Sequence, residues 1–159
     1  MYSSSVITNM RAPAVFFNCS LSLVLGLLIY ALIRDQPAIF LNFLPAIDAD
    51  NIEIIRFIIG LFSSDLRELI SNHGADFLWI YGLSIGHFHF FEESLSSLAN
   101  FCKIGIIPLI IAFVLEVLQI YESIGGTFDI GDLMVFVLGF SIATLVYKFS
   151  KRIVENDTN

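Results

Sequence analysis

Long apolar runs decide what this chain can fold into. Four of them approach the length of about 20 residues that an α-helix needs to cross the hydrocarbon of a bilayer. The sequence is 57% hydrophobic and only 14% charged, whereas a soluble domain carries about 25% charged residues. We therefore predict a single-domain, all-α, multi-pass transmembrane helical bundle with four spans, at about 14–33, 72–91, 103–121 and 130–149.

Two further segments belong to this prediction. One is the connection between the first two spans, and the other is the end of the chain. Residues 51–70 place Ile54, Ile58 and Leu61 at helical spacing, which is typical of an amphipathic helix at the interface. A fifth span is the alternative there. It is disfavoured because charges are costly in hydrocarbon, and this segment contains Glu53, Arg56, Asp65, Arg67 and Glu68. We expect residues 153–159, which are mostly polar, to form a disordered tail.

Charge limits the partners and orients the bundle. The net charge of −7 argues against nucleic acid, because phosphate binding needs a surface rich in Lys and Arg. Lys103, Lys148 and Lys151 all lie on the side of the predicted membrane that holds the two termini. Since cytoplasmic segments carry the excess of Lys and Arg, we expect both termini in the cytoplasm. The expected partners are membrane lipid, other membrane proteins or a second copy of the chain.

An acidic segment separates the last two spans. Glu116 and Gln119 are three residues apart and share one face of the third span. Asp129 and Asp132 have the same spacing at the start of the fourth. If the two spans form an antiparallel hairpin, these four side chains can converge beneath the outer surface. Carboxylates inside a membrane are candidates for function, so we predict an outward-facing acidic site.

Structural roles compete with this interpretation. Thr127 or Asp129 could cap the last helix, where a carboxylate meets unpaired N–H groups. Glu116 could bond Thr127 or the backbone of the turn and merely tie the hairpin together. Both alternatives stay open on the sequence.

The second span adds two candidates at the same predicted depth. Asp76 opens this span and could cap it, and Trp79 follows one turn later. Trp is also typical of the aromatic belt at a membrane interface. We include Asp76 and Trp79 in the predicted ligand site, with capping and belt roles as the alternatives.

Small residues predict the faces on which the spans pack. Gly82 and Gly86 are four apart on the second span, and Gly139 and Ala143 repeat this spacing on the fourth. Small residues at this spacing let two helices approach closely.

Catalytic and metal signatures are weak. His87 and His89 are two apart and point in different directions on a helix, and His73, which precedes the apolar run starting at about Asp76, is expected in a loop. No P-loop or zinc-protease motif is present in the sequence, and no nucleophile sits in a recognisable setting. We therefore predict no catalytic residue, no metal ligand and no cofactor.

The segment LEVLQIYESIGGTFDIGDLMVFVLGFSIATLVY, residues 115–147, resembles the signature of VanZ-like membrane proteins. That family shows a Glu and a Gln three apart, a turn containing Gly, then F-D-x-x-D and a later Gly in the last span. The matching residues here are Glu116, Gln119, Phe128, Asp129, Asp132 and Gly139, and Asp76 matches an Asp before the second span.

The resemblance has departures. The family often has Arg or Lys in the turn, where this chain has Gly126, and Asn in the last span, where this chain has Phe136. Arg34 or Arg67 could supply the basic residue. The resemblance implies a small multi-pass membrane protein, and it does not imply that this chain confers glycopeptide resistance.

Two functions lead on this basis. The first is a membrane protein whose outward acidic site binds a lipid, an envelope precursor or a cationic ligand. The alternative is a non-catalytic structural or accessory subunit of a membrane complex. An enzyme or a proton pathway is less favoured, because the spans contain no recognisable nucleophile and only a sparse set of polar residues.

Overall fold

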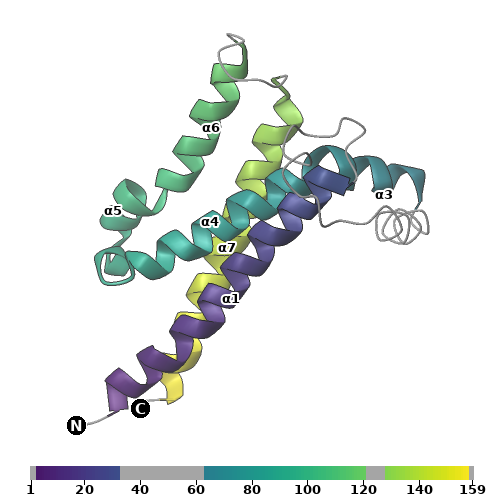
Figure 1. Ribbon diagram of the computed structural model, residues 1–159. Helices are drawn as coiled ribbons and strands as arrows, with labels where there is room; N and C mark the ends of the chain where they lie inside the picture. Colours follow the sequence, from purple (N-terminus) through teal and green to yellow (C-terminus); the bar gives the residue numbers. More distant parts are fainter. Residues whose placement is uncertain (1–2, 33–62, 121–127, 158–159) are drawn as a thin grey trace.

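The computed structural model describes residues 3–32, 63–120 and 128–157. These ranges are helical apart from short turns and contain no strand, so the predicted all-α class is confirmed for them. The elements, in chain order, are α1 (Ser3–Leu32), α3 (Ser64–Leu69), the π-helical turn η2 (Ile70–Gly74), α4 (Ala75–Phe90), the 3-10 turn η3 (Ser94–Ser96), α5 (Leu98–Asn100), the π-helical turn η4 (Phe101–Gly105), α6 (Ile107–Ile120) and α7 (Ile130–Asp157) (Figure 1).

Two predicted spans begin earlier in the structure than in the sequence pattern. Helix α4 continues back through η2 and α3 to Ser64, and α6 continues back through η4 and α5 to Leu98. At Leu98 the start is marked by Ser97, whose Oγ accepts a hydrogen bond from the Asn100 N–H at 3.2 Å. Since η2 contains His73, the prediction of a loop at His73 is wrong.

The end of the chain also differs from the prediction. Helix α7 runs to Asp157, so residues 153–157 are helical and the predicted disordered tail is wrong there. Extending an existing helix needs no new nucleation, and residues 150–157 contain neither Gly nor Pro. Most of the predicted interfacial helix, residues 51–62, lies outside the described residues.

Within the described ranges, two helices are long and apolar enough to cross a membrane. They are Leu98–Ile120 and Ile130–Arg152, and only 17% of each apolar window is buried inside the protein. The apolar part of α1, Pro13–Ile29, is shorter. A helix in the core of a soluble protein would bury its apolar side chains, whereas here Ile111 and Met134 are 52% and 70% exposed. This exposure supports a membrane location.

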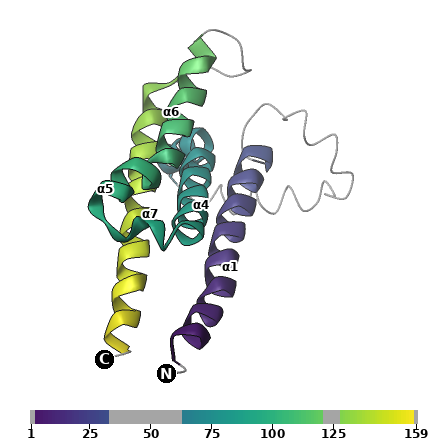
Figure 2. The same cartoon turned by 90° about the vertical axis from the view of Figure 1, so that its left-hand side faces the viewer.

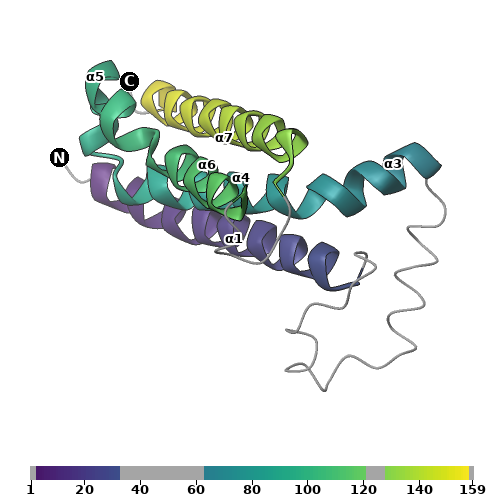
Figure 3. The same ribbon diagram turned by 90° about the horizontal axis from the view of Figure 1, so that it is seen from above.

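Helix α4 lies between α1 and α7 (Figures 2 and 3). On the α1 side, a Cβ at Gly82 would lie 3.2 Å from the Cys19 carbonyl oxygen, and one at Gly86 would lie 3.1 Å from the Cys19 Sγ. The Cys19 thiol donates to the Gly82 carbonyl at 3.1 Å. Gly82 and Gly86 therefore lie at the close helix contact for which the sequence pattern is suited.

The other face of α4 packs on α7. A Cβ at Gly139 would lie 2.5 Å from the Ile80 Cγ2, so this contact requires glycine. Ala143 is fully buried in the main core cluster. Phe88 forms the centre of that cluster, with its ring 5.4–5.7 Å from three other aromatic rings, those of Phe101, Phe140 and Tyr147. These contacts fix which face of α4 meets α7, and the candidate site lies at the far end of the same face.

Candidate functional site at the start of helix α7

Glu116 joins the end of α6 to the start of α7. Its side chain is buried, and the Oε1 accepts a hydrogen bond from the Asp129 backbone N–H at 2.8 Å. The Oε2 accepts a second one from the Gln119 amide at 3.1 Å. Both oxygens therefore have partners within the hairpin, in agreement with the sequence alternative that Glu116 bonds backbone near the turn.

Asp129 caps α7. Its Oδ1 accepts a hydrogen bond from the Gly131 N–H at 2.7 Å, and its carbonyl accepts the first helical bond, from the Asp132 N–H at 3.1 Å. This is the geometry of an N-cap residue. Of the two caps considered from the sequence, Asp129 has this role, and Thr127 lies outside the described residues.

The cap departs from a capping box in a way that affects the site. In a capping box, the acidic side chain three residues after the cap accepts the N–H of the cap residue. Asp132 occupies that position, but the Asp129 N–H is taken by Glu116. The Asp132 carboxylate is consequently available for a partner on another helix.

That partner is His73, which the sequence did not assign to the site. The His73 Nδ1 lies 2.7 Å from the Asp132 Oδ1, and the two side chains are 21% and 14% exposed. Gly131 makes room for the ring, because a Cβ there would lie 2.7 Å from the His73 Cε1. Once α4 is known to extend back to Ser64, His73 falls on the face of Phe77 and Ile80, which meets α7.

His73, Asp129 and Asp132 form a compact donor set, which we call the His–Asp cluster. One ligand atom from each residue lies within 4.8 Å of the other two. Asp129 is exposed, whereas His73 and Asp132 are half-buried. Among the side chains that the structure describes, neither carboxylate forms an ion pair with Lys or Arg. The cluster can therefore hold a metal ion or another cationic group.

The remaining predicted site residues lie elsewhere or have other roles. The Trp79 ring packs on α1, since a Cβ at Gly26 would lie 2.6 Å from the Trp79 Cδ1, so Trp79 faces away from the cluster. Asp76 is half-buried in the first turn of α4. Because the helix continues through Gly74 with helical dihedral angles, Asp76 has no helix end to cap. Arg34 and the side chain of Arg67 lie outside the described residues.

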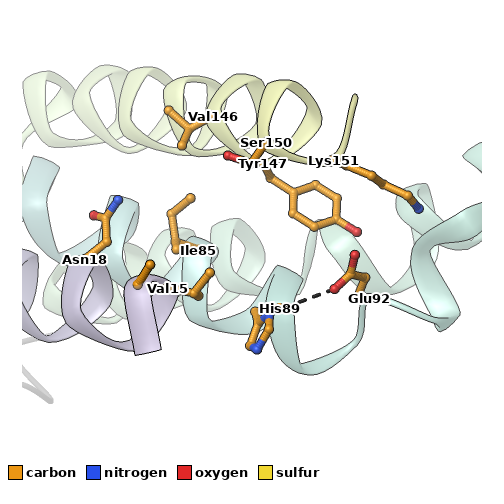
Figure 4. Close-up of a pocket in the computed structure, with 10 residues that line it drawn as sticks. Val15, Asn18, Ile85, His89, Glu92, Val146, Tyr147, Ser150 and Lys151 are labelled. Carbon is orange, nitrogen blue, oxygen red and sulfur yellow. Dashed lines mark ion pairs between the residues drawn. The ribbon is translucent and has the colours of Figure 1, made fainter. Parts of the chain in front are cut away.

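A separate cavity of about 200 Å³ lies between α1, α4 and α7, roughly 20 Å farther along α7. Figure 4 shows Val15, Ile85 and Val146 facing it, with His89 and Glu92 at one edge, where the His89 Nδ1 lies 3.9 Å from the Glu92 Oε2. None of the predicted ligand-site residues lines this cavity. Its apolar walls and polar edge suit a small amphipathic group.

Comparisons with protein-family models, with curated proteins and with solved structures find no match to this chain.

Proposed function

We propose that this chain is a small, VanZ-like, multi-pass membrane protein that binds a cationic group at the outward end of its bundle. The His–Asp cluster is the observation on which this proposal rests. Two carboxylates and one imidazole converge from η2 and α7, and an excess of acid over base attracts cations. The group could belong to a lipid head group or an envelope precursor, or it could be an inorganic ion.

The ligand set differs from the one predicted from the sequence. Glu116 accepts hydrogen bonds from the Gln119 amide and the Asp129 N–H within the hairpin, so we give both residues a supporting role and leave them out of the proposed ligand set. Asp129 and Asp132 remain in the set, and His73 joins them. The proposed site thus contains three side chains, held by the tie that Glu116 makes beneath them.

Four crossings are the proposed topology. Besides the two long apolar helices, α1 and the run from Ser64 to Phe90 would be the first and second spans. The start of α1 and the end of α7 lie at the same end of the bundle (Figures 1 and 2), which supports an even number of crossings. Lys148, Lys151 and Arg152 near the end of α7 favour a cytoplasmic position for that end.

The topology can be tested with fusions of green fluorescent protein and of alkaline phosphatase placed after residues 50, 97 and 159. The fusions after 97 and 159 are expected to fluoresce, and the phosphatase fused after 50 is expected to be active, because phosphatase folds only outside the cytoplasm. Active phosphatase after residue 159 would contradict the proposed orientation. Fluorescence after residue 50 would contradict a first crossing by α1.

Ligand binding can be tested by native mass spectrometry of the protein released from mild detergent. The probe is phosphatidylethanolamine, added in steps, with phosphatidylglycerol as the lipid that lacks an amine. The double variant Asp129→Asn/Asp132→Asn is expected to bind the amine lipid about tenfold more weakly, because charge-assisted hydrogen bonds contribute about 1.5–3 kcal/mol. Asn is as good an N-cap as Asp, so α7 should keep its start.

The matched control is Glu93→Gln, which removes an exposed acid just beyond the other end of α4 and should leave binding unchanged. Equal retention of the amine lipid by the wild type and the double variant would exclude an amine lipid as the ligand.

The accessory-subunit alternative is less supported by the packing. The small size of the chain and its small-residue faces suit such a subunit, but Gly82, Gly86 and Gly139 contact helices of the same chain. Those faces are therefore occupied before any partner binds.

A further inference from the structure

We infer that the cation bound by the His–Asp cluster is a divalent transition-metal ion, held by His73, Asp129 and Asp132. This inference rests on the proposed function and narrows its ligand. Two different parts of the chain supply the donors, because His73 lies in η2 whereas both aspartates begin α7. A bound ion would thus link the α4 run directly to α7.

The geometry is close to what a metal needs. Zinc–nitrogen and zinc–oxygen bonds are about 2.0–2.2 Å long, so neighbouring ligand atoms around one ion lie roughly 3–3.5 Å apart. The three donor atoms already lie within 4.8 Å of one another. Because Asp129 is exposed, its carboxylate can move the remaining distance without disturbing buried packing.

The surrounding contacts keep these donors in place. Asp132 and His73 are already paired at 2.7 Å, and Gly131 supplies the space for the imidazole. Asp129 uses its Oδ1 for the cap, and its carboxylate has a second oxygen that does not make this bond. A metal ion bound at the His73 Nδ1 would take the place of the hydrogen that now bridges it to Asp132, and the neutral imidazole would carry its proton on the Nε2 instead.

The donor types favour certain ions. Imidazole suits zinc and other first-row transition metals, and carboxylates suit manganese as well. The N-terminus of α7 carries a partial charge of about +0.5, which repels a cation. The two carboxylates together carry four times that charge with the opposite sign. Three protein ligands leave at least one coordination position for water or for an oxygen of a second ligand, as in catalytic zinc sites.

The test uses the full-length protein in detergent, stripped with a chelator and then titrated with Zn²⁺ alone or Mn²⁺ alone. Native mass spectrometry counts the ions per chain, and calorimetry gives the affinity. One ion per wild-type chain is expected. His73→Ala is expected to weaken binding at least tenfold, and Asp129→Asn, which keeps the cap, should weaken it several-fold.

The control is His89→Ala. His89 also lies near a carboxylate, that of Glu92, but this pair is at the other end of α4. It should bind the ion as the wild type does. The inference is overturned if the stripped wild type takes up no stoichiometric ion. It is also overturned if His73→Ala and Asp129→Asn both bind the ion like the wild type, or if His89→Ala loses as much affinity for the ion as His73→Ala. If the ion fails to bind but amine-lipid retention still depends on Asp129 and Asp132, only the metal is excluded and the proposed function stands.

Discussion

Glu116→Ala is expected to lower the free energy of unfolding by about 2–4 kcal/mol. The substitution leaves the Asp129 N–H and the Gln119 amide without the acceptors that they have now, and each buried unsatisfied group costs about 1–3 kcal/mol. Glu116 is only 2% exposed, so water cannot readily replace the lost oxygens. The measurement is loss of helical circular dichroism during thermal or denaturant unfolding in detergent.

Two comparisons make this result specific. Glu116→Gln keeps one acceptor oxygen for the Asp129 N–H and should cost less than Glu116→Ala. Glu93→Ala removes an exposed acid and should change stability by no more than about 0.5 kcal/mol. If Glu116→Ala proved as stable as Glu93→Ala, the hairpin tie would be wrong.

Gly139→Ala is expected to destabilise the protein by about 1–3 kcal/mol, the usual cost of overpacking a core. The new Cβ would lie 2.5 Å from the Ile80 Cγ2 and 3.0 Å from the Phe77 carbonyl oxygen. Ile80 is almost fully buried, so α4 and α7 must separate. The direction of the change in stability is informative, because Gly→Ala inside a helix otherwise stabilises a protein by about 0.5–1 kcal/mol.

The same unfolding assay checks this prediction. Ser141→Ala, two residues farther along α7 and exposed, serves as a control and should be nearly neutral. A more stable Gly139→Ala variant would show that α4 and α7 do not approach as closely as the structure places them.

Together these contacts divide the acids of the hairpin into two groups with different roles. Glu116 is buried and bonded to the backbone, so its carboxyl oxygens stabilise the start of α7. Asp129 and Asp132 lie above this tie, and His73 brings in a ligand atom from a second helix. Substitutions in the first group should change stability, and those in the second group should change binding.

Much of this arrangement follows from the sequence alone. The apolar runs determine where the helices lie, because a long apolar segment is most stable as a helix with its backbone bonds satisfied internally. The spacing of Gly82 and Gly86 predicts a close contact, since only small side chains let two backbones approach. The contact of Glu116 with Asp129 follows from an antiparallel pairing of α6 with α7.

Only the tertiary structure decided which of these acids remain available for a ligand. Periodicity defines the faces of a helix, but which face meets which neighbour depends on packing contacts between residues far apart in the chain. His73 and Asp132 are 59 positions apart, and they meet because Gly131 and Gly139 let α7 lie against one face of the α4 run. Likewise, the hydrogen bond from the Asp129 N–H to Glu116 depends on how far α6 and α7 are offset along their axes. That single bond keeps Asp132 out of a capping box and directs it to His73.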